Sequence, residues 1–304
     1  MRRRLSILTV LVMVVALMPV SASADPPSGV YISLGDSLAA GTQANDAVVT
    51  DDSYTDVLFQ RVADDLGLST HVKLGCPGET STTFLTGGCP AAAFIGGYTT
   101  GNQLGDALLE IAAAGADLRL ITIDLGANDV LRCLSDLQGQ PTLEACLAIV
   151  ALPTLAANLT TILATLQAVA PGVPIVGMNY YNPLLAWVLE DANAPFPGFG
   201  LASQNLVLGL NNVLHLAYGG AFGGGAVTPV PVVDIAGAFH TFDATRNVKD
   251  VCRFTLMCER DGADLVMSDW DPDPGPQPDI HPTDMGYRQM AWAFMQTMET
   301  AGIV

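Results

Sequence analysis

The chain has 304 residues, of which 50% are hydrophobic, and its 30 acidic residues against 12 Lys and Arg give a formal charge of −18. Nucleic-acid binding is excluded, because contacts to phosphates need clustered Lys and Arg and no basic run follows the first four residues. Disorder is excluded as well, because only 14% of the residues are charged and apolar periodicity runs through the chain.

The first 24 residues have the pattern of a secretory signal peptide. Three arginines at 2–4 precede an apolar stretch from Leu5 to Val20, and Ala-Ser-Ala at 22–24 fits a cleavage site. We expect cleavage before Asp25; the alternative is an uncleaved anchor, since the stretch approaches the roughly 17 residues that span a bilayer. No later segment is expected to span. Without residues 1–24, which hold three arginines and no acid, the charge is −21, so we expect an exported, soluble, acidic protein.

Short β-rich runs alternate with helical periodicity along the rest of the chain. The first strand is predicted over Val30–Ser33, and the helix after it has Ser53 as its N-cap and Gly67 as its stop. This alternation predicts parallel strands joined by right-handed crossovers, hence an α/β fold: a three-layer α/β/α sandwich around a mainly parallel five-stranded sheet. The later predicted strands cover 71–74, 118–123, 173–178 and 230–235, and the later helices 101–115, 154–169, 201–218 and 283–300.

Six cysteines in an exported chain favour disulfides over free thiols. Six cysteines allow fifteen connectivities, and the sequence alone does not choose among them. Their spacings of 13, 13 and 6 residues suggest three sequential local bridges, and no Cys-x-x-Cys pair suggests zinc. The suggested pairs are Cys76 with Cys89, Cys133 with Cys146, and Cys252 with Cys258.

Four short motifs stand where parallel strands are predicted to end or where the last helix begins. Because chemistry in such sheets lies at the carboxyl ends of the strands, these motifs are expected to meet at one edge. They are Gly-Asp-Ser-Leu at 35–38, Gly-Cys-Pro-Gly-Glu-Thr at 75–80, Gly-Ala-Asn-Asp at 126–129 and Asp-Ile-His-Pro at 279–282.

The four motifs, in this order, resemble those of the SGNH or GDSL hydrolases, whose named residues are a Ser, a Gly, an Asn and a His. The resemblance runs from Val30 to the C-terminal helix. It implies a serine esterase or lipase on a flavodoxin-like sheet, with residues 25–304 as a single domain. It also implies that the Gly78 backbone N–H and the Asn128 side-chain amide stabilise the oxyanion, together with the Ser37 N–H.

The residue types agree with ester hydrolysis without the family name. Ser37 is the candidate nucleophile because the glycine before it permits a tight turn off the first strand; the alternative is a helix N-cap serine. His281 is the candidate base, since it stands in a Pro-flanked turn before a helix. The other histidines, at a strand start, on a helix face and in a loop, are expected to be structural: His71, His215 and His240.

One departure from the family pattern concerns the acid that orients the histidine. The family usually has Asp-x-x-His, but position 278 is proline, and Asp279 stands two residues before His281. Either Asp279 orients the ring from an altered geometry or a backbone carbonyl of 276–279 replaces it, since an imidazole N–H needs only an acceptor.

The loop after the fourth strand is aromatic and could line an acyl-chain groove, with Tyr180, Tyr181, Trp187 and the Phe196–Phe199 segment as candidates. The alternative is a local packing cluster. An acid-rich loop at 269–273 could ligate calcium, but it lacks the ligand spacing of known calcium loops, and a solvated loop is preferred.

We therefore expect a secreted monomeric esterase that acts on fatty-acyl or lipid esters through an acyl-enzyme on Ser37 and needs no metal or organic cofactor. Its rate should rise with pH through about 6 to 7, where imidazole becomes neutral. Two alternatives remain open, a carbohydrate O-deacetylase using the same residues and a non-catalytic wall- or glycan-binding protein.

Overall fold

A five-stranded sheet, parallel throughout, forms the centre of the protein and confirms the predicted fold class. Its strands are β1 Gly29–Gly35, β2 Leu68–Lys73, β3 Leu118–Asp124, β4 Ile175–Met178 and β5 Val232–Val233, in the order β2-β1-β3-β4-β5. The central strands β1 and β3 are almost entirely buried, as expected for strands covered on both faces. The computed structural model describes residues 28–43, 49–190, 198–261, 264–267 and 279–304.

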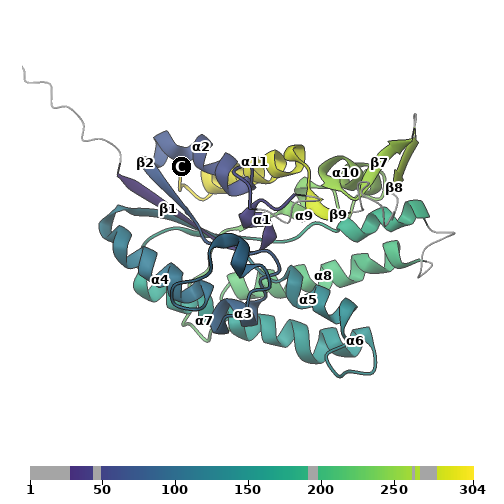
Figure 1. The fold of residues 1–304 in the computed structure, drawn as a ribbon, viewed down its shortest axis with the longest axis horizontal. Helices are drawn as coiled ribbons and strands as arrows, with labels where there is room; N and C mark the ends of the chain where they lie inside the picture. Colours follow the sequence, from purple (N-terminus) through teal and green to yellow (C-terminus); the bar gives the residue numbers. More distant parts are fainter. Residues whose placement is uncertain (1–27, 44–48, 191–197, 262–263, 268–278) are drawn as a thin grey trace, which may run out of the picture.

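Helices cover both faces of the sheet, which gives three layers (Figure 1). One layer holds α2 Tyr54–Leu66 and α11 Asp284–Thr300, which pack against each other. The other layer holds α4 Gln103–Ala114, α7 Leu152–Val169 and α8 Phe199–Tyr218, with α7 in contact with both α4 and α8. The resulting α/β/α sandwich leaves the carboxyl edge of the sheet to the connecting loops.

Shorter elements occupy these connections. The short helices are α1 Ser37–Ala40, α3 Ser81–Thr86, α5 Ala127–Ser135, α6 Leu143–Cys146, α9 Ile235–Ala238 and α10 Asn247–Phe254. Four further helical turns are η1 Ala92–Ile95, η2 Gly115–Asp117, η3 Leu147–Ala151 and η4 Pro183–Glu190. Two antiparallel strand pairs complete the described chain, β6 Thr255–Leu256 with β9 Asp279–Pro282, and β7 Cys258–Asp261 with β8 Asp264–Met267.

The helix α2 begins and ends where the sequence predicts. The Ser53 side chain accepts from the Asp56 N–H while the Asp56 side chain accepts from the Ser53 N–H, and Gly67 ends the helix at φ +60°. Residues 279–282 differ from the prediction, because they form a strand rather than a turn. This difference decides how the candidate histidine is oriented.

One helical stretch after the N-terminal segment, Leu143–Val169, is long and apolar enough to span a membrane by those two criteria alone. By length and composition this stretch differs from the expectation that no segment after residue 24 could span. One face of α7 is buried in the protein core, whereas 33% of the most apolar window of the whole stretch is buried. The fully buried residues of that face are Leu155, Leu159, Ile162, Leu163 and Leu166.

Three disulfides join the pairs that the spacing suggests, Cys76–Cys89, Cys133–Cys146 and Cys252–Cys258. The first closes the loop that contains Gly78, the second links α5 to α6, and the third links α10 to β7 around β6. The predicted signal peptide at 1–24, the acid-rich loop at 269–273 and residues 196 and 197 lie outside the described residues.

Candidate active site

A pocket at the carboxyl edge of the sheet brings together three of the four motifs. The chain runs from β1 to β2 on one side and reaches β3 on the other, so the loop after β1 lies at the topological switch point, where such sheets bind ligands. The polar lining residues are Asp36, Ser37, Asn128, Tyr180, Tyr181 and His281. Most of the remaining lining is apolar, with Leu38, Val130, Leu131, Leu184, Leu206, Val207, Leu210 and Ile280 among its members.

Ser37 is the first residue of α1, directly after β1. Its side chain faces the pocket, and the residue as a whole is 8% exposed. Asp36 caps the helix by accepting the Leu38 N–H at 2.9 Å, so the N-cap function that Ser37 could have served belongs to its neighbour. Within the described chain the Ser37 N–H donates to no protein acceptor, and it remains available to a substrate oxygen.

Gly78 lies in the turn that the first disulfide encloses. The Glu79 N–H donates to the Cys76 carbonyl at 3.0 Å, with Pro77 and Gly78 at the centre of the turn. A φ of +83° at Gly78 is what the third position of a type II turn requires, and glycine adopts it without steric cost. Among the described residues the Gly78 N–H donates to no acceptor. Gly78 is not among the lining residues of the pocket, although Asn128 reaches the turn.

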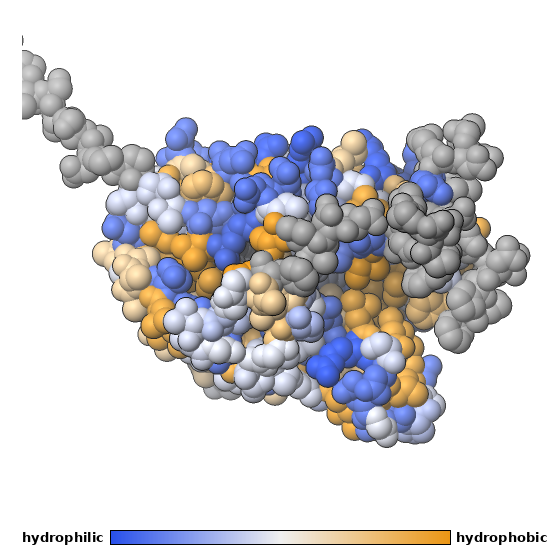
Figure 2. Space-filling model, viewed as in Figure 1, coloured by the Kyte–Doolittle hydropathy of each residue, from blue (hydrophilic) through white to orange (hydrophobic). Residues whose placement is uncertain are grey.

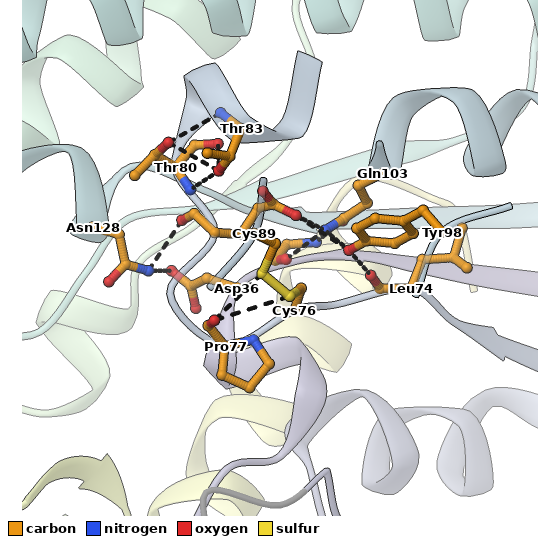
Figure 3. The surroundings of a disulfide bond; sticks show 12 residues. Asp36, Leu74, Cys76, Pro77, Thr80, Thr83, Cys89, Tyr98, Gln103 and Asn128 are labelled. Carbon is orange, nitrogen blue, oxygen red and sulfur yellow. Dashed lines mark hydrogen bonds between the residues drawn. A yellow bond between two sulfur atoms is a disulfide. The ribbon is translucent and has the colours of Figure 1, made fainter. Parts of the chain in front are cut away.

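Asn128, in the first turn of α5, connects the other two motifs. Its Nδ2 donates to the Glu79 carbonyl at 3.0 Å and lies 3.5 Å from Asp36 Oδ2 (Figure 3). The first contact is a normal hydrogen bond, whereas the second is long and weak. The amide is therefore held at the pocket wall with one N–H only loosely engaged.

His281 lies in β9 with Asp279 beside it. Alternate residues of a strand point to the same face, so an acid two positions before the histidine contacts it, whereas in a turn its direction would be undefined. Asp279 Oδ1 lies 2.5 Å from His281 Nδ1 and accepts the His281 backbone N–H at 2.9 Å. Burial would raise the pKa of Asp279, but the hydrogen bonds from His281 hold this pKa below its usual value. The Asp279 carboxylate therefore contacts the ring; of the carbonyls considered as an alternative, those of residues 276–278 lie outside the described residues.

Contacts on both sides hold β9 in place. The Tyr181 hydroxyl donates to the Ile280 carbonyl at 2.6 Å, and its ring stacks on Phe239 with centroids 4.5 Å apart. On the other side β9 pairs with β6, and the Thr283 N–H donates to the Phe254 carbonyl at 2.9 Å. Helix α1 and β9 are in contact. Among the described residues no hydrogen bond joins Ser37 Oγ to the imidazole, a bond that often tightens only when substrate binds.

A second Ser-His-Asp arrangement shows that residue types alone do not locate the site. Ser33 Oγ lies 2.9 Å from His71 Nε2, and His71 Nδ1 lies 3.4 Å from Asp56 Oδ1. Ser33 is fully buried, and the Tyr31 ring stacks on His71 at 4.4 Å. No substrate carbonyl reaches this serine, so His71 is structural, as predicted.

Of the aromatic residues predicted to bind substrate, two line the pocket and one does not. Tyr180 and Tyr181 line the pocket, but both hydroxyls are engaged by protein, Tyr180 with Asp36 Oδ2 at 3.0 Å. Trp187 packs against the small cluster that contains Val251 and Met257, and the structure does not bring it to the pocket. Glu79, Cys76 and Cys89 lie close enough to suggest metal ligands, but both sulfurs are joined in the disulfide.

Two polar anchors of the site, Asp129 and Glu79, stand within the quoted motifs but were not singled out as site residues. Asp129 accepts from the Ser81 N–H at 2.9 Å and from its hydroxyl, which ties α5 to α3. Burial raises the pKa of Asp129 to about 6. Glu79 is fully buried, which raises its pKa, and it accepts from Gln103 and Tyr98 at 2.9 and 3.1 Å (Figure 3).

Comparisons with known proteins agree with this arrangement. The model of a family described as the GDSL-like Lipase/Acylhydrolase family matches residues 33–289. No curated protein matches the chain.

Three solved structures share the fold at 14–16% identity. A GDSL-like lipase from Parabacteroides merdae is 14% identical, with a TM-score of 0.53 over 91% of this chain and 97% of its own. An extracellular lipase from Streptomyces rimosus is 16% identical, with a TM-score of 0.52 over 90% and 99%. Phospholipase A1 from Streptomyces albidoflavus is 16% identical, with a TM-score of 0.51 over 90% and 98%.

Proposed function

The chain belongs to the GDSL-like lipase/acylhydrolase family, and from this premise we propose that it is a secreted serine esterase that cleaves fatty-acyl or lipid esters. The observation that carries the proposal is the pocket itself. A serine, a histidine paired with a carboxylate, and an asparagine amide surround one apolar cavity at the switch point of the sheet.

The reaction proceeds in two steps. His281 takes the proton of the Ser37 hydroxyl as its oxygen bonds to the ester carbonyl carbon; the carbon–oxygen bond to the alcohol then breaks, and the imidazolium returns the proton to the leaving oxygen. Water next attacks the acyl-enzyme with the same imidazole as base, which releases the acid and restores Ser37. Asp279 fixes the tautomer through Nδ1 and stabilises the imidazolium.

Negative charge develops on the carbonyl oxygen in both steps. The Ser37 and Gly78 backbone N–H groups and the Asn128 amide are the donors proposed for it. All three donors are uncharged, so placing them in a buried oxyanion site does not require removing a charge from water. Loss of one such donor typically lowers kcat by about 10²- to 10³-fold.

The pocket lining supports an apolar acyl group. The side chains beyond the candidate catalytic residues are aliphatic, from α5, η4 and α8, and burying a methylene contributes about 0.8 kcal/mol. The pocket offers fewer free polar groups for a sugar ring than apolar side chains for an acyl chain. The hydroxyls of Tyr180 and Tyr181 are already hydrogen-bonded to protein.

The distribution of charge around the pocket supports an uncharged substrate. Between Glu144 and Asp234 the sequence has no Lys or Arg, and its only acids are Glu190 and Asp191. Helix α8 lies in this segment and exposes Leu201 and Leu208. Apolar side chains gather where α8 runs, and apolar and polar side chains are mixed where α6 lies (Figure 2).

Secretion is part of the proposal and is supported by the three disulfides and by the pattern of residues 1–24. The exported protein should begin at Asp25, which N-terminal sequencing of culture supernatant measures. A first residue at Met1 would contradict cleavage.

The substrate class is tested with nitrophenyl esters of acetate, butyrate and octanoate. We expect kcat/KM for octanoate to exceed that for acetate by at least about tenfold, and Ser37→Ala to abolish both activities while Ser135→Ala, an exposed serine on α5, keeps them. Leu206→Asn, in the pocket wall, should reduce octanoate hydrolysis selectively, with exposed Leu216→Asn on the same helix as its control. A preference for acetate would favour the O-deacetylase, and no hydrolysis the non-catalytic binding protein.

A further inference from the structure

Two buried carboxyl groups face each other behind Ser37. Asp36 is 1% exposed, and Asp124, the last residue of β3, is fully buried. The two side chains interact with each other, and two carboxyl groups can share a hydrogen bond only when one of them carries a proton. In the described part of the chain neither forms an ion pair with Lys or Arg.

The donors around the pair show which carboxyl carries the charge. Asp36 accepts from the Leu38 N–H, from the Tyr180 hydroxyl at 3.0 Å and more weakly from Asn128 Nδ2. Asp124 accepts from the Tyr54 hydroxyl at 2.9 Å and from the Ala39 N–H at 3.2 Å. Burial raises the pKa of both acids, and the charge of Asp36 raises that of Asp124 further. Asp36 has the larger set of donors, which favours Asp36 as the carboxylate and Asp124 as the acid that keeps the proton.

The backbone makes room for this contact at one position. A Cβ on Gly35 would lie 2.2 Å from the Asp124 carboxyl oxygen Oδ1 and 2.2 Å from its backbone oxygen, at a φ of +139° that side chains rarely adopt. The same segment is tied by the Asp36 N–H, which donates to the Asp124 carbonyl at 3.2 Å. Glycine at 35 thus permits the close approach of the two acids.

We propose that Asp124 is a positioning residue: its protonated carboxyl donates to Asp36, and the Asp36 carboxylate caps the start of α1, which carries Ser37, and attracts the loosely engaged N–H of the Asn128 amide. Without that proton, two buried charges would repel each other and pull the amide and the serine turn out of register. The proposal rests on the proposed ester hydrolysis only for its kinetic readout.

The pair is surrounded by groups that do not supply a competing charge. Burial raises the pKa of Glu79 and of the six tyrosines that face the pair, and His281 is a basic side chain that interacts electrostatically with Asp36. Once the pH is raised far enough for the pair to lose its proton, kcat should fall. The titratable groups of the described residues that face the pair are Tyr31, Tyr54, Tyr180, Tyr181, Tyr218, Tyr287, Glu79 and His281.

The kinetic test compares two variants at one position. In Asp124→Asn the amide donates as the protonated acid does, so kcat should stay within about threefold and the alkaline loss should disappear. In Asp124→Ala the donor is gone, so kcat should fall about 10- to 100-fold with KM little changed. Equal losses in both folded variants, or full activity in Asp124→Ala, would overturn the proposal.

A second measurement does not depend on activity or on the alanine variant folding. The infrared difference between wild type and Asp124→Asn at pH 7 should contain the carbonyl band of a protonated carboxylic acid. Glu79 is present in both proteins, so its contribution cancels. Absence of the band would overturn the shared proton even in an active esterase, and its presence in an inactive protein would leave the pair standing while the proposed function failed.

Discussion

Asp129 provides a test in which the magnitude comes directly from the structure. Its carboxyl is 8% exposed, and burial raises its pKa from 3.8 to about 6. A raised pKa means that the fold prefers the protonated form, so its stabilising contribution is complete below pH 3.8 and is lost as the pH rises through 6. Two pKa units at 1.36 kcal/mol each correspond to a loss of about 3 kcal/mol.

The assay is urea unfolding of wild type and Asp129→Asn, with disulfides intact, between pH 3.5 and 7.5. Asparagine stays neutral at every pH. As the pH rises from 3.5 to 7.5, the unfolding free energy of wild type should therefore fall by about 3 kcal/mol relative to that of Asp129→Asn. Asp65→Asn, which removes an exposed carboxyl on α2, controls for the loss of one charge. A difference that stays constant with pH would refute the reasoning that burial dominates at Asp129.

Two further predictions concern the parts that hold the candidate histidine. Asp279→Asn should lower kcat by about 10² to 10⁴, because the amide neither stabilises the imidazolium nor enforces the tautomer; steady-state kinetics with less than a threefold loss would contradict the carboxylate's part. Replacing Cys252 and Cys258 by serine should lower the unfolding free energy by about 2 kcal/mol and also lower kcat, because the bridge encloses β6, the partner of β9. The same change at Cys133 and Cys146 should cost about 3 kcal/mol but leave kcat unchanged; equal effects on kcat would argue against β6 as a brace.

Sequence patterns predicted the central fold because its elements are long and locally marked. Helix α2 has a capping serine, an acid three residues later and a terminal glycine, and each does in the structure what its type predicts. The alternation of strands and helices predicted a parallel sheet, and a parallel sheet brings the motifs after its strands to one edge. Ser37, Asn128 and His281 accordingly line one pocket there.

Short elements and side-chain directions were not predictable. Strands β6 and β9 have two and four residues, too few for an alternating pattern, and their pairing connects segments that lie far apart in the sequence. The altered Asp-x-His spacing therefore looked ambiguous, although a strand places both side chains on one face. Trp187 packs against a small hydrophobic cluster and not in the pocket, because a loop sequence does not determine the direction of a side chain. The partnership of Asp36 with Asp124 depends on the register of β1 and β3, which only the structure supplies.

The most direct test of the central claim is covalent labelling of the nucleophile. The protein is treated with an aryl alkylphosphonate, which transfers its phosphonyl group to an activated serine, and the adduct is located by peptide mass spectrometry. We predict one adduct per molecule, on Ser37, with activity lost in proportion and no labelling in His281→Ala. An unlabelled Ser37 in a protein that still hydrolyses esters, or an adduct on another residue that accounts for the loss of activity, would contradict the account.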